Sequence, residues 1–173
     1  MAVYALGELV PDIHPDAFVH PDATVIGQVT IGAESTVWPQ AVLRGDYGHI
    51  VVGERTSIQD GTVVHVPGHI AGTFIGSDCV VGHLAHLEGC RIEDHCLVGS
   101  GSIVLHDVVV HTGSIVGANA VVTNGTIVPP RSMALGVPAV VKEGVVKPGA
   151  TDLAVGVYVS NGRRYAATLR RLD

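Results

Sequence analysis

The sequence predicts an all-β fold, a parallel β-helix of about seven stacked coils followed by one C-terminal α-helix. The first observation behind this prediction is a period of six, because over most of the chain every sixth residue is aliphatic. This period matches neither the 3.6 of a helix nor the 2 of a simple strand, and it is typical of short strands separated by tight turns. The aliphatic positions are Ile13, Val19, Val25, Ile31, Val37, Leu43, Val52, Ile58, Val64, Ile75, Val81, Leu87, Ile92, Val98, Val104, Val110, Val116, Val122 and Val128, with a weak end at Ala134.

The second observation is a small residue two positions before most of these aliphatic residues, as in Ala23, Thr62 and Cys96. Residues two apart on a strand share a face, so both should point into the coil and their neighbours should point outward. Between them stand turn-forming pairs such as Pro21-Asp22 and Asn124-Gly125. Three such hexads per coil would build a prism in which each coil buries its neighbour.

The third observation is that the rhythm breaks in the middle third of the chain. The steps from Leu43 to Val52 and from Val64 to Ile75 are longer than six, and the step from Leu87 to Ile92 is shorter. Insertions in a solenoid usually form loops on one face, often the binding face. We therefore look for function there and expect loops at 44–49 and around 67–69.

After Ala134 the chain leaves the repeat, and we expect a single domain, 1–173, with the β-helix over about 11–140 and a helix over about 152–172. In the last segment one helix face is formed by residues at steps of three and four. Gly156 and Gly162 weaken this prediction. The face should pack on the prism or on a neighbouring subunit. Its members are Ala154, Tyr158, Asn161, Tyr165, Leu169 and Leu172.

Composition narrows the class of protein. The formal net charge of −6, without a basic stripe, argues against a nucleic-acid partner. No apolar run reaches the roughly 20 residues of a membrane span, and no signal peptide is evident, so we expect a cytoplasmic protein. The three cysteines occupy small inward positions and should be reduced core residues.

Ten histidines are an unusually large number for a chain in which only 15% of the residues are charged. His65 should point outward from its strand, and His86 and Glu88 should both point outward from another. Because one coil separates His65 from Glu88, their side chains should stack at strand spacing, about 4.8 Å. Imidazole and carboxylate are ligands for zinc or a similar ion, but solvated polar residues would give the same pattern. The remaining histidines in turns and loops are expected to have no special role: His14, His20, His49, His69, His95, His106 and His111.

Several motifs, in order and correctly spaced, resemble the γ-class carbonic anhydrase family. The resemblance runs from about Pro11 to Tyr165. The motifs are Leu43-Arg44-Gly45-Asp46, Ile58-Gln59-Asp60-Gly61, His65, Val81-Gly82-His83, Gly89-Cys90 and Gly136-Val137-Pro138-Ala139.

This resemblance implies a homotrimer of left-handed β-helices, with Zn²⁺ or another divalent metal such as Fe²⁺ or Co²⁺ held between subunits by three histidines from two chains. His65 matches the first ligand, and His83 matches the one supplied by the neighbouring chain. Gln59 matches the residue that hydrogen-bonds metal-bound water, and Tyr158 resembles a helix tyrosine that comes near the metal. An interface ion-pair network is matched by Arg44, Asp46 and Asp60.

One departure from the family stands at Glu88, where the third histidine is expected. The family's backbone position favours Glu88 as the third ligand. The alternatives are that His86 reaches the metal with Glu88 behind it, or that the metal is lost. The acidic loop that shuttles protons in active relatives has no clear match within 46–52 or 67–71.

The leading functional hypothesis is therefore a γ-carbonic-anhydrase-like enzyme. Its metal would lower the pKa of a bound water, and the resulting hydroxide would attack CO₂ to give bicarbonate. A carboxylate ligand would weaken the metal as a Lewis acid, so CO₂ hydration should be slow or another substrate is used. The alternatives are a hexapeptide acyltransferase with a histidine base acting on an acyl-CoA, or a non-catalytic metal-binding trimer.

Overall fold

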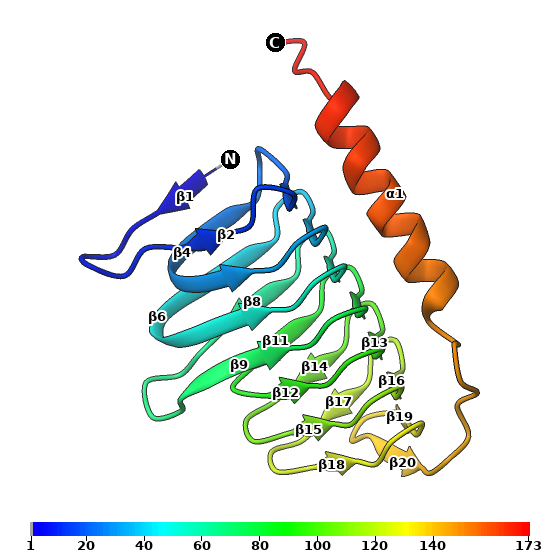
Figure 1. The fold of residues 1–173 in the computed structure, drawn as a ribbon. Coiled ribbons are helices and arrows are strands. Elements are labelled where there is room, and N and C mark those ends of the chain that lie inside the picture. The colour runs from blue at the N-terminus through cyan, green and yellow to red at the C-terminus, as the bar shows by residue number, and fades with distance from the viewer. Residues whose placement is uncertain (1) are drawn as a thin grey trace.

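The computed structural model describes residues 2–173 as a left-handed parallel β-solenoid of about seven turns with a single C-terminal helix, as predicted. Figure 1 shows the coils stacked from the N-terminal end to the C-terminal end, with the helix along one side. The strands are β1 (Ala2–Tyr4), β2 (Asp12–Ile13), β3 (Phe18–Val19), β4 (Thr24–Ile31), β5 (Thr36–Val37), β6 (Val42–Val52), β7 (Ser57–Ile58), β8 (Val63–His65), β9 (Gly72–Ile75), β10 (Val80–Val81), β11 (His86–Glu88), β12 (Arg91–Ile92), β13 (Leu97–Val98), β14 (Ile103–Val104), β15 (Val109–Val110), β16 (Ile115–Val116), β17 (Val121–Val122), β18 (Ile127–Val128), β19 (Met133–Leu135) and β20 (Val140–Lys142).

The prism has three faces, each made of parallel strands from successive coils. One face is the sheet β3-β5-β7-β10-β13-β16-β19, closed by β20, which pairs antiparallel with β19. A second face runs β8-β11-β14-β17, and a third runs β9-β12-β15-β18. The second and third faces form one continuous sheet, because β6 pairs with β8 at its beginning and with β9 at its end.

The core consists of the inward aliphatic and small residues that the period of six predicts. From Val25 to Ala134 every one of these aliphatic residues is at most 2% exposed. Several inward hydroxyls donate to carbonyl groups of the next coil, as in Thr62 Oγ1 donating to the Gly82 oxygen at 2.7 Å. Cys79, Cys90 and Cys96 are free and buried, and burial raises the pKa of the Cys90 thiol to about 12. The prediction of reduced core cysteines is confirmed.

The first break in the rhythm is not the loop that the sequence predicts. Residues 44–49 lie within β6, an unbroken strand of 11 residues that turns the corner between two faces. It runs beside β4, which turns the same corner, and their pairing shifts between Gly27 and Val29. Glycine is required here because a Cβ on Gly45 would lie 2.5 Å from the Gln28 oxygen, and one on Gly27 would lie 2.4 Å from the Gly45 oxygen. Close backbone contact therefore explains the glycine between Arg44 and Asp46.

The second break does form a loop, over 66–71, between β8 and β9. Its turn is closed by the Ile70 N–H, which donates to the Pro67 oxygen at 3.0 Å. The third break shortens one coil, so that Leu87 pairs with Val104, 17 residues later. The loop follows β8, the strand that pairs with β11, and the short step follows β11, the strand that carries Glu88.

The C-terminal helix, α1, spans Asp152–Thr168 and ends four residues before the predicted limit of 172. The chain becomes extended at Leu169, and Leu172 is 83% exposed, so the end of the predicted apolar face is not helical. Tyr158 and Tyr165 contact Trp38 edge-on, with ring centroids 6.0 Å and 5.0 Å apart. Within this chain the helix therefore packs on its own prism.

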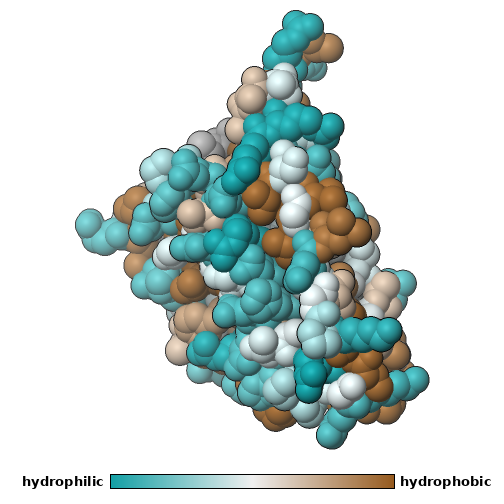
Figure 2. All heavy atoms as spheres, turned by 45° about the vertical axis from the view of Figure 1, so that its right-hand side comes forward, coloured by the Kyte–Doolittle hydropathy of each residue, from teal (hydrophilic) through white to brown (hydrophobic). Residues whose placement is uncertain are grey.

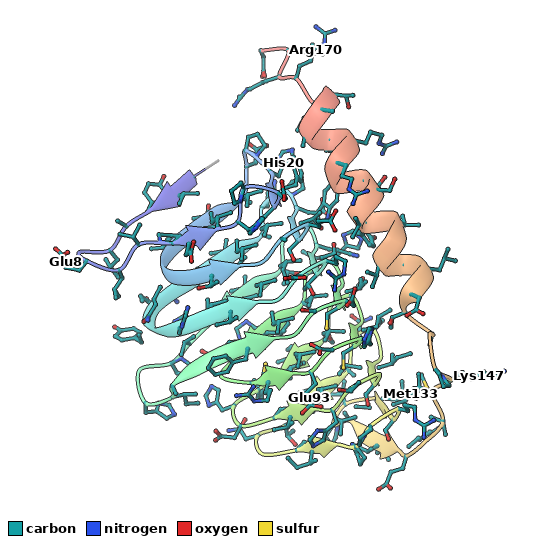
Figure 3. The ribbon with its side chains drawn as sticks, in the orientation of Figure 1. Glu8, His20, Glu93, Met133, Lys147 and Arg170 are labelled. Carbon is teal, nitrogen blue, oxygen red and sulfur yellow. The ribbon has the colours of Figure 1, made fainter. Side chains whose placement is uncertain are left out.

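Around this helix the surface is mixed in character. Figure 2 shows mostly hydrophilic residues on this side, with hydrophobic ones gathered in separate patches. Figure 3 places Lys147 in the linker that joins the last coil to the helix. Among residues 2–173 there is no helix long and apolar enough to cross a membrane.

The two helix glycines should respond oppositely to alanine. Gly156 has open space around it, so Gly156→Ala should raise the free energy of unfolding by about 1 kcal/mol through helix propensity. Gly162 is buried, and a Cβ there would lie 2.5 Å from Thr36 Cγ2. Gly162→Ala should therefore overpack the contact and lower stability, because overpacking costs about 1–3 kcal/mol. Thermal unfolding of both variants measures this, and a stabilised Gly162→Ala protein would contradict the helix docking.

Candidate functional site

The structure brings His65 and Glu88 together as the sequence predicts. Glu88 pairs in register with His65, on adjacent strands β11 and β8. The His65 Nδ1 atom lies 3.0 Å from Glu88 Oε1. Both side chains are mostly shielded, with 14% of His65 and 22% of Glu88 exposed. The predicted stacking of these two residues is confirmed.

On the other side of His65 the neighbour is Asp46, from β6. Asp46 Oδ1 lies 3.2 Å from His65 Nε2, and Asp46 Oδ2 accepts a hydrogen bond from the Arg44 guanidinium. Burial raises the pKa of Asp46, but hydrogen bonds from its own backbone N–H and from Arg44 outweigh this effect and leave the pKa below its usual value. Arg44 and Asp46 are thus joined within one chain.

Glu88 lies among three imidazoles. Besides His65, the Nε2 atoms of His106 and His86 approach Glu88 Oε2, at 3.0 Å and 3.5 Å. The hydrogen bond with His65 is the largest cause of a pKa of about 2 for Glu88, and His106 and His86 add to it against the opposing effect of burial. Glu88 is therefore a carboxylate throughout the neutral range.

His106 is the member of this cluster that the sequence analysis missed. It lies in the turn that follows β14, one coil beyond Glu88. The spacing alone did not reveal it, because the 17-residue register pairs Leu87 with Val104 and so sets Leu105, rather than His106, level with Glu88. His106 lies in the turn two positions after the inward Val104, and from there its Nε2 atom lies 3.0 Å from Glu88 Oε2.

His83 and Asp60 form a separate pair at the edge of another face. His83 Nδ1 lies 2.9 Å from Asp60 Oδ2, and the two side chains are 50% and 48% exposed. Asp60 thus contacts His83 and makes no ion pair with Arg44. No hydrogen bond or ion pair joins His83 to the His65 and Glu88 group within residues 2–173.

The two remaining predicted residues lie on the face that α1 covers. Gln59 directly follows β7 and is buried, with 3% of its surface exposed. Tyr158 contacts Trp38, and no ring contact or hydrogen bond links it to His65 in the described part of the chain. One chain alone thus does not bring Gln59 and Tyr158 onto His65.

The donors present in one chain make up part of a metal site. In the part of the chain that the structure describes, no group of three or more His, Cys, Asp or Glu side chains is arranged to hold a metal ion. His65 and Glu88 nevertheless offer a nitrogen and an oxygen donor, which suit zinc, iron or cobalt. The exposed His83 is a further imidazole that could serve a second copy.

The chain is similar in sequence to known hexapeptide-repeat proteins, including a gamma carbonic anhydrase. The bacterial transferase hexapeptide family (six repeats) matches residues 11–45 and 89–124. The mitochondrial gamma carbonic anhydrase 2 of Arabidopsis thaliana is 44% identical over 105 residues, which cover 58% of this chain and 38% of that protein. The chain thus spans well under half the length of this plant relative.

Two further relatives are matched over more of their length. The carnitine operon protein CaiE of Escherichia coli K12 is 41% identical over 140 residues, which cover 80% of this chain and 70% of CaiE. The crystal structure of a hexapeptide transferase family protein from Anaplasma phagocytophilum superposes with a TM-score of 0.89 at 32% identity, covering 95% of this chain and 98% of that one. The chain therefore belongs to the hexapeptide-repeat family, together with the gamma carbonic anhydrases and CaiE.

Proposed function

We propose that this chain is the subunit of a metal-dependent homotrimer that hydrates CO₂ to bicarbonate at a site between neighbouring subunits. The observation that carries the proposal is the pair of His65 and Glu88, stacked on adjacent strands with donor atoms 3.0 Å apart. The similarity to gamma carbonic anhydrase 2 supports the reaction class.

His65, Glu88 and the His83 of a second copy would be the protein ligands. Two imidazoles and a carboxylate form a donor set that holds Zn²⁺, Fe²⁺ or Co²⁺ and leaves positions open for water and substrate. Between the rival third ligands, the register favours Glu88, because Glu88 pairs with His65 whereas His86 pairs with Val63. His86 then belongs to the surroundings of the carboxylate.

A divalent ion held there would supply the Lewis acidity that makes hydroxide available from water near neutral pH. Asp46 would keep the ring of His65 oriented through the contact at Nε2 or release that nitrogen to the metal. Gln59 would hydrogen-bond the attacking water, and Tyr158 would shape the pocket on the neighbouring subunit. A shared site would explain why neither side chain hydrogen-bonds to His65 or Glu88 within the described residues of its own chain.

The experiment that tests this function measures bound metal and CO₂ hydration on the same purified protein. We expect about one divalent ion per subunit, as the threefold symmetry of a trimer with three equivalent sites requires, and a CO₂ hydration rate that falls to background in His65→Ala. Elemental analysis and stopped-flow hydration with a pH indicator make the measurement. A trimer that contains metal but has the same hydration rate as His65→Ala would exclude the enzymatic function while keeping the metal site.

The second candidate function is acyl transfer, which the relationship to the Anaplasma phagocytophilum hexapeptide transferase family protein favours. A histidine such as His86, 38% exposed, would then act as the base on an acyl-CoA. Titration with acetyl-CoA separates the two functions, because a carbonic anhydrase has no need to bind it.

A further inference from the structure

Glu88 is the residue on which the proposed metal site depends, and a glutamate needs external support to act as a fixed ligand. Its side chain has three rotatable torsions, and metal ligands are usually held in place by hydrogen bonds from neighbouring residues. The two carboxylate oxygens of Glu88 face different partners. Oε1 faces His65, and Oε2 faces His106 at 3.0 Å.

Two contacts hold His106 in position. Its backbone oxygen accepts a hydrogen bond from the Gly125 N–H at 2.9 Å, which anchors the turn to the next coil. Its ring contacts His69 edge-on, with centroids 5.7 Å apart, so the loop over 66–71 supports it from the other side. Three-quarters of the His106 side chain is shielded, since 25% is exposed.

His86 is a weaker partner for the same oxygen. Its Nε2 atom lies 3.5 Å from Glu88 Oε2, beyond the usual range of N–H···O hydrogen bonds, about 2.7–3.2 Å. It is also more exposed than His106, at 38% against 25%. Of the two imidazoles near Oε2, His106 is therefore the one that can fix the carboxylate.

We propose that His106 is a positioning residue that donates from Nε2 to Glu88 Oε2 and so holds Oε1 beside His65 for a divalent cation. This inference rests on the proposed metal site and adds a residue to it from the next coil. Because His106 acts only through the carboxylate, it should matter only when residue 88 is glutamate.

A double-mutant cycle with Co²⁺ as the probe tests this. His106→Phe keeps the ring contact with His69 and removes the donor, whereas His106→Gln keeps an N–H donor. We expect His106→Phe to weaken Co²⁺ binding by about 10–100-fold, the usual cost of losing a hydrogen bond to a metal ligand. His106→Gln should recover part of the affinity and restore the visible absorption bands of the bound Co²⁺. In the Glu88→His background, His106→Phe should change the affinity by less than about 3-fold.

Each result has a distinct meaning. An unchanged Co²⁺ affinity in His106→Phe, with Co²⁺ bound to the wild type, would overturn the role of His106 and leave the proposed function standing. An equal loss in both backgrounds would also overturn it, because His106 would then act without Glu88. Absence of Co²⁺ binding in the wild type and in every variant would overturn both proposals. Thermal unfolding of the metal-free variants serves as the control for folding.

Discussion

Glu88→Ala should lose most of its bound metal, whereas His86→Ala should keep most of it. Glu88 supplies one of only three proposed protein ligands. Its removal should lower the metal affinity by more than about 100-fold, since losses in the surroundings of a metal already cost 10–100-fold. His86 approaches only Glu88, at 3.5 Å, and pairs in register with Val63 rather than His65. Elemental analysis of the two purified variants side by side makes the comparison.

Glu88→His extends the same prediction to activity. A carboxylate donates more charge to a metal than imidazole does, so a histidine there should leave the metal a stronger Lewis acid. We expect faster CO₂ hydration at neutral pH in this variant. The reverse pattern, with metal lost only in His86→Ala, would make His86 the third ligand. Full metal content in both alanine variants would exclude both residues.

Mixed trimers of His65→Ala and His83→Ala subunits should recover metal that neither variant binds alone. If each site combines His65 of one subunit with His83 of the next, random one-to-one mixing leaves about one quarter of the sites with both histidines. The two variants can be refolded together and their metal content compared with that of each variant refolded alone. Recovery to near one quarter of the wild-type metal content is the expected result. No recovery would mean that the two histidines do not meet across a subunit boundary.

Much of this architecture could be predicted from the sequence because each hexad repeats the same physical requirement. Val64 and Leu87 must point inward, so His65 and Glu88 must point outward, and their stacking follows from the length of one coil. The corner at 44–49 could not be predicted in the same way. Nothing in the local sequence says that Gly45 lies against the Gln28 backbone and lets one strand continue around the corner.

The candidate site was only partly predictable for a related reason. His106 lies in a turn, where the inward and outward alternation of a strand no longer gives the direction of a side chain, so the sequence pattern did not place it beside Glu88. For His83 the sequence of one chain is not enough to predict the role. Its place beside Asp60 can be read from one chain, but its proposed role depends on a surface that a second copy supplies.

The continuous strand β6 has a mechanical consequence. In most coils two faces meet at a turn that belongs to no strand. At β4 and β6 two neighbouring strands turn the same corner together and remain hydrogen-bonded on either side of it. The pairing on both sides should stiffen this corner of the prism, and Arg44 and Asp46 lie on it. A stiff corner would hold Asp46 beside His65, the residue that its carboxylate contacts at 3.2 Å.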